Sequence, residues 1–377
     1  MHRRRCLKHL AQITLGVLVE WMGLTSVFSE IGITPRAYYM PPEWHFHDRC
    51  WMAFASSGYG TWGNTLEAVR REQVDIAKLI ARQEPVTMLA NPGDESQART
   101  LCGPTLSVLT LKLDDLWIRD TGPTFVCGAN QESAAINWNF NVWGNKAGSR
   151  YDKGLADRLG MHMKIPMVRA PMVGEGGAIH VDGAGTLLTT ESCLLNKNRN
   201  PGLSKRDIEQ VFSDLLGVRK VIWLPGSTRE YITDGHIDGI CFFAKPGQVV
   251  AQITDDPNDP EYKIMQENFR ALQAATGARN KPLEIVPVLP PRYRYIGDKN
   301  EDFAASYVNV YLPNRGIVMP KFGDPIRDEA AAEITAEVLP QRKLYQVRID
   351  AIAEGGGGIH CITQQQPRCA GLPVEGG

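Results

Sequence analysis

The sequence has no excess of charge of either sign: its 377 residues include 41 Lys and Arg against 42 Asp and Glu, a formal net charge of −1. That balance gives no electrostatic basis for binding nucleic acid or an acidic surface. Low-complexity tracts are missing as well, and no apolar stretch is long and uncharged enough to span a membrane. These absences disfavour nucleic-acid-binding and membrane-spanning proteins and favour a globular protein with a mixed surface.

Cysteine is present, but without the close spacing of a disulfide framework or a zinc site. The eight cysteines are Cys6, Cys50, Cys102, Cys127, Cys193, Cys241, Cys361 and Cys369. Seven would remain if an N-terminal segment were removed, so at least one is expected to stay unpaired within a monomer.

The N-terminal segment resembles a twin-arginine export signal. Residues 3–8 are rich in arginine, residues 11–19 are mildly apolar, and a small-residue cleavage point follows near Ser29. Glu20 within the apolar stretch argues against this interpretation. The location therefore stays open: periplasmic or secreted if the signal functions, cytoplasmic otherwise.

Periodicity along the chain predicts alternating helices and strands. Leu66, Val69 and Val74 lie on the apolar face of one expected helix. Another begins with a capping pattern at Ser204 and stops at Gly217. Helices are expected at residues 64–82, 204–216, 262–276 and 328–339, and strands at 86–89, 221–224, 285–289 and 308–312. The pattern predicts an α/β fold, and nothing in the middle resembles a linker.

Two segments of the chain look alike. Residues 175–180 read Glu-Gly-Gly-Ala-Ile-His, and residues 354–360 read Glu-Gly-Gly-Gly-Gly-Ile-His, the second followed at once by Cys361. A repeated Gly-rich bend with a thiol in one copy is typical of a repeat architecture with one reactive repeat. Cys361 alone fits an inert buried residue equally well, since free cysteine is often a small hydrophobe.

Other turns favour a chemical role for that thiol. Residues 117–123 and 233–239 carry Asp and His beside glycine at the ends of apolar runs. Two carboxylates near a thiol would oppose an oxyanion but would suit a planar guanidinium, whose forked donors match carboxylates. Covalent attack by Cys with His moving protons is the expected chemistry. A metal set of His236, Asp238, His360 and Cys361 is the alternative.

The chain resembles the agmatine deiminase and bacterial-type peptidylarginine deiminase family of the guanidine-modifying (pentein) superfamily. The resemblance rests on many short stretches in the same order, any one of which is weak alone. They are residues 39–44, 117–126 (WIRDTGPTFV), 136–144 (INWNFNVWG), 175–183, 189–201 (TTESCLLNKNRNP), 235–238, 305–309 (ASYVN), 322–328 (FGDPIRD) and 358–367.

The resemblance implies a role for each matching residue. Cys361 is the expected nucleophile that forms a covalent thiouronium adduct, and His236 is the acid and base. Asp120 and Asp238 are the expected guanidinium clamps. The expected substrate-pocket residues are Trp117, Asn309 and Glu175. The family needs no metal or cofactor, and His180, whose repeat lacks the cysteine, is expected to be structural.

The implied fold is the pentein α/β-propeller, about five ββαβ units with pseudo-fivefold symmetry. The landmarks Asp120, Glu175, His236, Asn309 and Cys361 are separated by 55, 61, 73 and 52 residues, each interval large enough for one small module. The expected organisation is an N-terminal segment 1–34, one catalytic domain 35–370, and a tail 371–377.

The implied reaction is hydrolysis of agmatine to N-carbamoylputrescine and ammonia. Residues 139–144 contain no Arg, which favours a guanidine without a carboxylate over peptidylarginine. Two departures from the family pattern that flank the expected pocket, at residues 226–230 and Asp234, leave another alkylguanidine open. A third, Gly358 where Asn is common, is expected to lower activity or alter the turn before Cys361. An amidinotransferase and a non-catalytic guanidine-binding protein also stay open. The expected partner is a small guanidine, with no nucleic acid or membrane; a homo-oligomer is not decided by the sequence.

Overall fold

The structure is a computed structural model and describes residues 38–58, 62–227, 229–297, 299–300 and 302–370. The chain divides into two compact units, Met1–Ala37 and Tyr38–Gly377. The first unit, with the predicted export signal, lies outside the described residues, as does the predicted tail 371–377. None of the described helices is long and apolar enough to cross a membrane.

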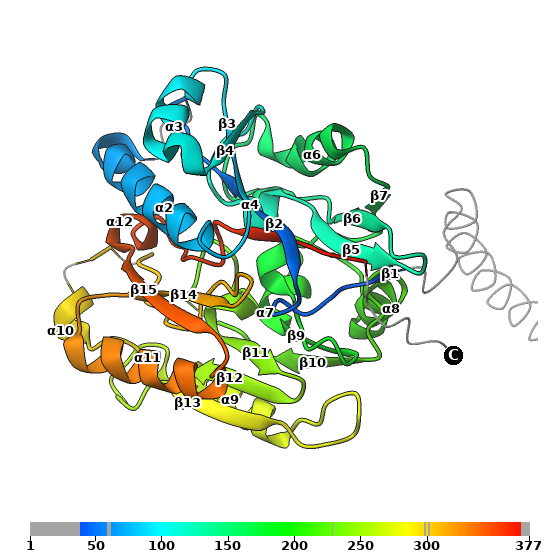
Figure 1. Cartoon of the computed structure of the whole chain (residues 1–377). Coiled ribbons are helices and arrows are strands. Elements are labelled where there is room, and N and C mark those ends of the chain that lie inside the picture. The colour runs from blue at the N-terminus through cyan, green and yellow to red at the C-terminus, as the bar shows by residue number, and fades with distance from the viewer. Residues whose placement is uncertain (1–37, 59–61, 228, 298, 301, 371–377) are drawn as a thin grey trace, which may run out of the picture. The chain divides into compact units, whose positions relative to one another are not determined.

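The strands form five small sheets within the described part of the chain (Figure 1). In sheet order they are β1 (Tyr38–Tyr39), β5 (Thr124–Gly128), β6 (Ser133–Asn137) and β7 (Met167–Arg169); β10 (Lys220–Leu224), β9 (Thr186–Thr190) and β8 (His180–Val181); β11 (Cys241–Lys245), β12 (Gln248–Gln252) and β13 (Glu284–Val288); β14 (Gly316–Lys321) and β15 (Lys343–Arg348); and β16 (Gln364–Pro367), β2 (His47–Ala53), β3 (Val86–Ala90) and β4 (Ser107–Thr110).

The helices lie mainly between successive strands of these sheets. They are α2 (Leu66–Ile80), α3 (Glu95–Cys102), α4 (Ile118–Thr121), α5 (Val142–Asn145), α6 (Leu155–Met163), α7 (Glu191–Leu194), α8 (Lys205–Leu216), α9 (Tyr262–Ala274), α10 (Tyr293–Ile296), α11 (Pro325–Val338) and α12 (Asp350–Ala353). Short 3-10 turns are Gly63–Thr65, Gly103–Thr105, Asp152–Gly154, Gly176–Ala178 and Ile237–Gly239.

One connection pattern recurs among the sheets. In the sheets of β5, β8 and β11, an antiparallel pair is followed by helix and then by a strand parallel to the second member of the pair. β16, near the C-terminal end, pairs antiparallel with β2, near the start of the second unit, as Figure 1 shows. The predicted mixed α/β fold is confirmed.

Most of the predicted elements are confirmed, with shifted ends. α8 begins after Ser204, whose side chain accepts the backbone N–H of Asp207 in a capping box, and it ends at Gly217 with φ of 68°. α9 stops at Ala274 instead of residue 276, because the next segment pairs as an extended bridge, Thr276 with Pro282. α11 starts earlier than predicted, because Asp324 caps it and Pro325 occupies its first turn.

The strand predicted at residues 308–312 is wrong. Within that segment Tyr311 alone makes a bridge, to Val318. The rest forms tight turns, in which Asn309 N–H bonds the carbonyl of Ser306 and Val310 N–H bonds that of Val308. The apolar residues are buried as expected, but the backbone turns to bring Asn309 toward the loop ends of the neighbouring sheets.

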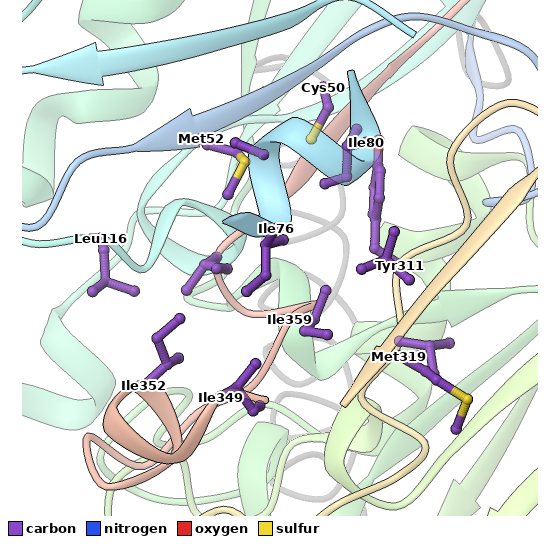
Figure 2. Packing of buried hydrophobic residues seen from close by; sticks show 14 of the residues in the cluster. Cys50, Met52, Ile76, Ile80, Leu116, Tyr311, Met319, Ile349, Ile352 and Ile359 are labelled. Atoms are coloured by element: carbon purple, nitrogen blue, oxygen red, sulfur yellow. The ribbon is translucent and has the colours of Figure 1, made fainter. Parts of the chain in front are cut away.

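The largest buried cluster supports the segment that carries Cys361. Ile359 has no exposed surface and packs in one cluster with Ile76, Met319 and Ile352 (Figure 2). Burying one such side chain contributes about 1.5–3 kcal/mol. Cys361 therefore lies two residues after a side chain that is fixed in the core.

A disulfide that the sequence did not predict joins Cys127, on β5, to Cys369, just after β16, with their Cα atoms 5.3 Å apart. The two cysteines are 242 residues apart. Their pairing depends on β16 and β5 lying in contact, which no spacing rule shows. Of the other cysteines in the described ranges, Cys50, Cys102, Cys193 and Cys241 are free and buried, and Cys361 is free and partly exposed.

Candidate active site

A pocket of about 890 Å³ lies at the loop ends, and its lining includes His236, Asp238, Asn309 and Cys361. These are four of the seven predicted site residues. They come from three segments of the chain, each more than 50 residues from the next. Two more, Asp120 and Glu175, are buried within 3.7 Å of the His236 ring. The fold thus brings residues from five distant turns together.

Cys361 stands at the wall of this pocket. Its Sγ lies 3.4 Å from Asn309 Nδ2 and 3.7 Å from Asp238 Oδ2. Burial and the charges of Asp238 and Asp120 raise the pKa of the Cys361 thiol well above its usual value. In the free protein the thiol is therefore protonated, and a cation bound between the carboxylates would favour the thiolate.

Glycine is needed in the bend before Cys361 because of close neighbours. A Cβ on Gly357 would lie 2.3 Å from the Trp117 ring, and one on Gly358 would lie 2.4 Å from Asn309 Oδ1. Asn309 Oδ1 accepts the backbone N–H of His360 at 2.8 Å, so this amide supports the bend beside Gly358. Trp117 packs against the bend and is not among the residues that line the pocket, and its contact with substrate stays a prediction.

Arg119 connects the segment of Asp120 to that of Cys361. Its backbone N–H donates to the Cys361 carbonyl at 3.1 Å, and its buried side chain donates to the His360 carbonyl at 3.2 Å and to Gln365 Oε1 at 2.7 Å. These hydrogen bonds fix the position of Arg119 relative to His360, 241 residues further along the chain.

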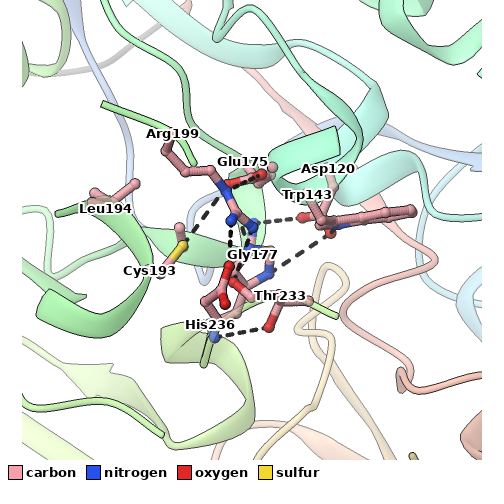
Figure 3. A network of polar contacts seen from close by, with 12 residues as sticks. Asp120, Trp143, Glu175, Gly177, Cys193, Leu194, Arg199, Thr233 and His236 are labelled. Carbon is pink, nitrogen blue, oxygen red and sulfur yellow. Dashed lines mark hydrogen bonds and ion pairs between the residues drawn. The ribbon is translucent and has the colours of Figure 1, made fainter. Parts of the chain in front are cut away.

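His236 lies between two carboxylates (Figure 3). Its Nδ1 is 3.7 Å from Asp120 Oδ2, and its Nε2 is 3.6 Å from Glu175 Oε2. Burial opposes the charged ring, but Asp120, Cys193 and Glu175 together raise the pKa of His236 well above its usual value. The ring is thus a cation in the free protein and has a proton to give.

The two aspartates expected to hold a guanidinium are both buried. Asp120 Oδ1 accepts the N–H of Gly177 at 3.0 Å, and its Oδ2 accepts Trp143 Nε1 at 2.9 Å. Burial and the nearby Asp238 and Glu175 raise the pKa of Asp120, although the His236 charge lowers it. Crowded carboxylates of this kind gain stability from a bound cation.

Asp238 has a different partner. Its Oδ2 accepts a hydrogen bond from His360 Nδ1 at 2.7 Å. Burial alone would raise the pKa of Asp238, but the hydrogen bond and charge of His360 lower it below the usual value. Asp238 is therefore an anion beside the thiol.

Gly177 allows these groups to converge. A Cβ at that position would lie 2.6 Å from His236 Nδ1, 2.9 Å from Asp120 Oδ1 and 3.0 Å from Asp238 Oδ2. The sequence identified the Gly-rich bend but not this reason for it.

The two carboxylate oxygens of Glu175 have different partners, Arg199 at Oε1 and His236 at Oε2. Arg199 Nε donates to Glu175 Oε1 at 2.8 Å with both side chains fully buried. Burial would raise the pKa of Glu175, but His236 and Arg199 lower it. Arg199, Cys193 and Trp143 were not identified as site residues from the sequence, because their roles depend on neighbours supplied by other segments.

The loop that departs from the family pattern is tightly fixed where the structure describes it. Asp234, in a left-handed conformation with φ of 61°, accepts from Lys146 at 2.6 Å and from Arg199 at 2.5 Å. Burial alone would raise the pKa of Asp234, but Lys146, Asn198 and Arg199 lower it. Glu230 accepts the N–H groups of Ile232, Thr233 and Gly235. The hydrogen bonds of Asp234 and Glu230 therefore fix the backbone of this loop.

The four residues weighed as a metal set do not form a compact donor group. Within the described ranges, donor atoms lie within 4.8 Å of one another in Glu43, His180 and His360, and in Glu175, Cys193 and His236. In both groups a carboxylate is already paired with a cation or an imidazole.

A thiol at the pocket wall lies beside an imidazolium and an excess of carboxylates, and a bound planar cation would offset their negative charge. This arrangement defines the class of protein as guanidine-modifying. Residues 39–367 match the family model described as Porphyromonas-type peptidyl-arginine deiminase, and the chain belongs to that family.

Related proteins agree with this assignment. The chain is 40% identical to the agmatine deiminase of Stutzerimonas stutzeri over 359 residues, covering 89% of this chain and 97% of the relative. The solved agmatine deiminase of Enterococcus faecalis is similar with a TM-score of 0.83 and 30% identity, over 89% and 97% of the two chains. An amidinotransferase from Microseira wollei shares the fold alone, with a TM-score of 0.50 and 12% identity over 90% and 99%.

Proposed function

We propose that this chain is a hydrolase that converts agmatine and water to N-carbamoylputrescine and ammonia. The observation that carries the proposal is the Cys361 thiol 3.7 Å from Asp238, at a pocket that His236 also lines. The relatives named agmatine deiminase support the choice of substrate.

The reaction begins with the guanidinium bound between Asp120 and Asp238. Its charge offsets the two anions that disfavour the thiolate, so the thiol of Cys361 releases its proton to solvent and the sulfur attacks the central guanidine carbon. The carbon becomes tetrahedral. His236, an imidazolium in the free protein, then gives its proton to one nitrogen, and ammonia leaves as the carbon–nitrogen bond breaks.

The remaining adduct is a thiouronium on Cys361. His236, now neutral, takes a proton from water, and the hydroxide adds to the same carbon. The carbon–sulfur bond breaks, and the leaving thiolate takes the proton of the new hydroxyl group. This restores the Cys361 thiol and releases the neutral ureido product. Glu175 stabilises the charged form of His236 throughout, while Asn309 Nδ2, 3.4 Å from Sγ, stabilises the thiolate.

The fold that belongs to this proposal is the pentein propeller, five units around one axis. Five sheets, three of them with the same strand and helix order, support it, as does the convergence of Asp120, Glu175, His236, Asn309 and Cys361 from five successive turns. The catalytic domain comprises residues 35–370 in this proposal.

The charges around the pocket favour agmatine over arginine. Apart from Asp238, the pocket lining contains five carboxylates and two guanidinium groups: Glu230, Asp255, Asp256, Asp259, Glu261, Arg292 and Arg327. Arg292 is paired with Asp324 at 2.5 Å, and Arg327 with Asp255 at 3.2 Å. A substrate carboxylate would meet net negative charge, whereas the second ammonium group of agmatine would be attracted.

The test is to measure ammonia and ureido product from the purified full chain. Agmatine, free arginine and an arginine-terminated peptide are assayed in parallel, with Cys361→Ala as the blank. We expect turnover of agmatine at least about tenfold above the other two substrates in kcat/KM, the equivalent of 1.4 kcal/mol. Turnover that requires an added amine acceptor would favour amidino transfer, and ammonia release by the blank would overturn the mechanism.

A further inference from the structure

The two look-alike segments deliver their histidines to one carboxylate. His360 Nε2 lies 2.9 Å from Glu43 Oε2, and His180 Nε2 lies 3.5 Å from the same oxygen. The two rings are 6.1 Å apart. Glu43 comes from residues 39–44, one of the stretches that carry the family resemblance, and the mechanism above gives it no role.

Glu43 is connected to the nucleophile through His360. The second ring nitrogen of His360, Nδ1, lies 2.7 Å from Asp238 Oδ2, and that oxygen is 3.7 Å from Cys361 Sγ. Glu43, His360 and Asp238 are each at most 4% exposed. A continuous line of buried polar groups thus runs from Glu43 to the thiol.

The partners of His360 define its protonation. Both ring nitrogens face ionised carboxylate oxygens, which only accept hydrogen bonds, so both nitrogens must carry protons. Burial and the nearby Arg119 lower the pKa of His360, but Glu43 and Asp238 raise it above the usual value overall. The pKa of Glu43 lies well below its usual value because His360 and His180 outweigh its burial.

His180 is the neutral member of the pair. The backbone N–H of Phe243 donates to His180 Nδ1 at 3.4 Å, so Nε2 carries the proton that faces Glu43. Burial lowers the pKa of His180, in agreement with this tautomer. Glu43 therefore has one cationic and one neutral imidazole around it, and only the cationic one reaches Asp238.

We propose that Glu43 is a positioning residue for deimination, which holds His360 as a doubly protonated ring that orients Asp238 and offsets part of its charge beside Cys361. The proposal rests on the proposed function for its kinetic consequences. Asp238 must bind a guanidinium and also tolerate a thiolate 3.7 Å away. The positive charge of His360 reduces the repulsion between Asp238 and the thiolate, and His360 does so without occupying the pocket.

Loss of the Glu43 charge has a distinct kinetic signature. In Glu43→Gln the ring of His360 has one anionic partner fewer, so its pKa falls and it becomes neutral at a lower pH. A neutral ring no longer offsets the negative charge of Asp238. Thiolate formation then becomes harder, while binding of a cationic substrate does not weaken. We expect kcat to fall by about 10- to 100-fold, the range found when the hydrogen-bond partner of a metal-ligating histidine is removed. KM should stay within about twofold or decrease.

The matched control is Glu84→Gln. Glu84 is also buried, lies 3.1 Å from His47 Nδ1, and accepts the hydroxyl of Tyr311 at 2.6 Å, but it does not lead to the pocket. Both substitutions remove one buried carboxylate beside one histidine. Kinetics on agmatine and alkylation of Cys361 by iodoacetamide are measured for both between pH 6 and 10.

The proposal predicts that Glu43→Gln alone slows alkylation and moves the acidic limb of the kcat profile to higher pH. Equal effects of the two substitutions, or a rise in KM for Glu43→Gln, would overturn it. If Glu43→Gln does not fold, His360→Gln carries the same test, because the amide keeps hydrogen bonds and removes the charge. Wild-type protein inactive on agmatine would refute the proposed function, whereas the alkylation comparison would still decide the role of Glu43.

Discussion

Replacement of Asp238 by Asn should make the free thiol more reactive while it weakens substrate binding. Asp238 Oδ2 is 3.7 Å from Cys361 Sγ, and a full charge at about 4 Å is worth about 4 kcal/mol at an effective dielectric constant of about 20. The His360 cation offsets part of this repulsion. If one third of it remains, about 1.4 kcal/mol, alkylation of Cys361 at pH 8 should be about tenfold faster in the variant.

The same substitution removes one of the two charges that hold the guanidinium. KM for agmatine should therefore rise by at least about tenfold, since a hydrogen bond to a charged group contributes about 1.5–3 kcal/mol. The amide oxygen of Asn can still accept the hydrogen bond from His360 Nδ1, so the fold should be kept. The assays are iodoacetamide labelling, steady-state kinetics and thermal unfolding, with Cys361→Ala as the labelling blank. A variant that is folded, has unchanged KM and labels more slowly than wild type would refute the reasoning.

Three further predictions concern packing, cross-linking and pH. Gly177→Ala would place a methyl group 2.6 Å from His236 Nδ1, so we expect kcat to fall about 100-fold in a folded protein; wild-type kcat would contradict this. Cys127→Ala with Cys369→Ala should lower the free energy of unfolding by about 2–4 kcal/mol in denaturant titrations, and an unchanged midpoint would count against it. The pKa of Cys361 is raised in the folded state, so above about pH 8.5 the thiol ionises more readily in the unfolded chain and the free energy of unfolding falls. In Cys361→Ala the free energy of unfolding should fall less steeply above that pH, by up to about 1.4 kcal/mol per pH unit.

Local signals in the sequence were sufficient for much of the secondary structure. The capping box at Ser204 and the stop at Gly217 depend only on neighbours in the chain, and α8 follows them. The strand expected at residues 308–312 failed because apolar content alone does not separate a buried turn from a buried strand. That turn is stabilised by contacts with residues far away in the chain, such as the bond from Asn309 to His360.

For the site, the sequence supplied the reacting groups but not their partners. Cys361, His236, Asp120 and Asp238 could be predicted from the residue types in the turns and from the family resemblance, and the fold brings them close together. Their electrostatic partners could not, since Arg199 on Glu175 and Glu43 on His360 are distant pairings that only the fold creates. The same holds for the disulfide between the ends of β5 and β16.

The most direct test of the central claim is to look for the covalent adduct on Cys361. Protein turning over agmatine is quenched in acid, digested and examined by mass spectrometry. The account predicts that the peptide containing Cys361 gains the mass of agmatine less that of ammonia, and that the gain is missing when Cys361 is replaced by Ala. Product formation with no adduct on any peptide, or with the adduct on Cys193 instead, would contradict it.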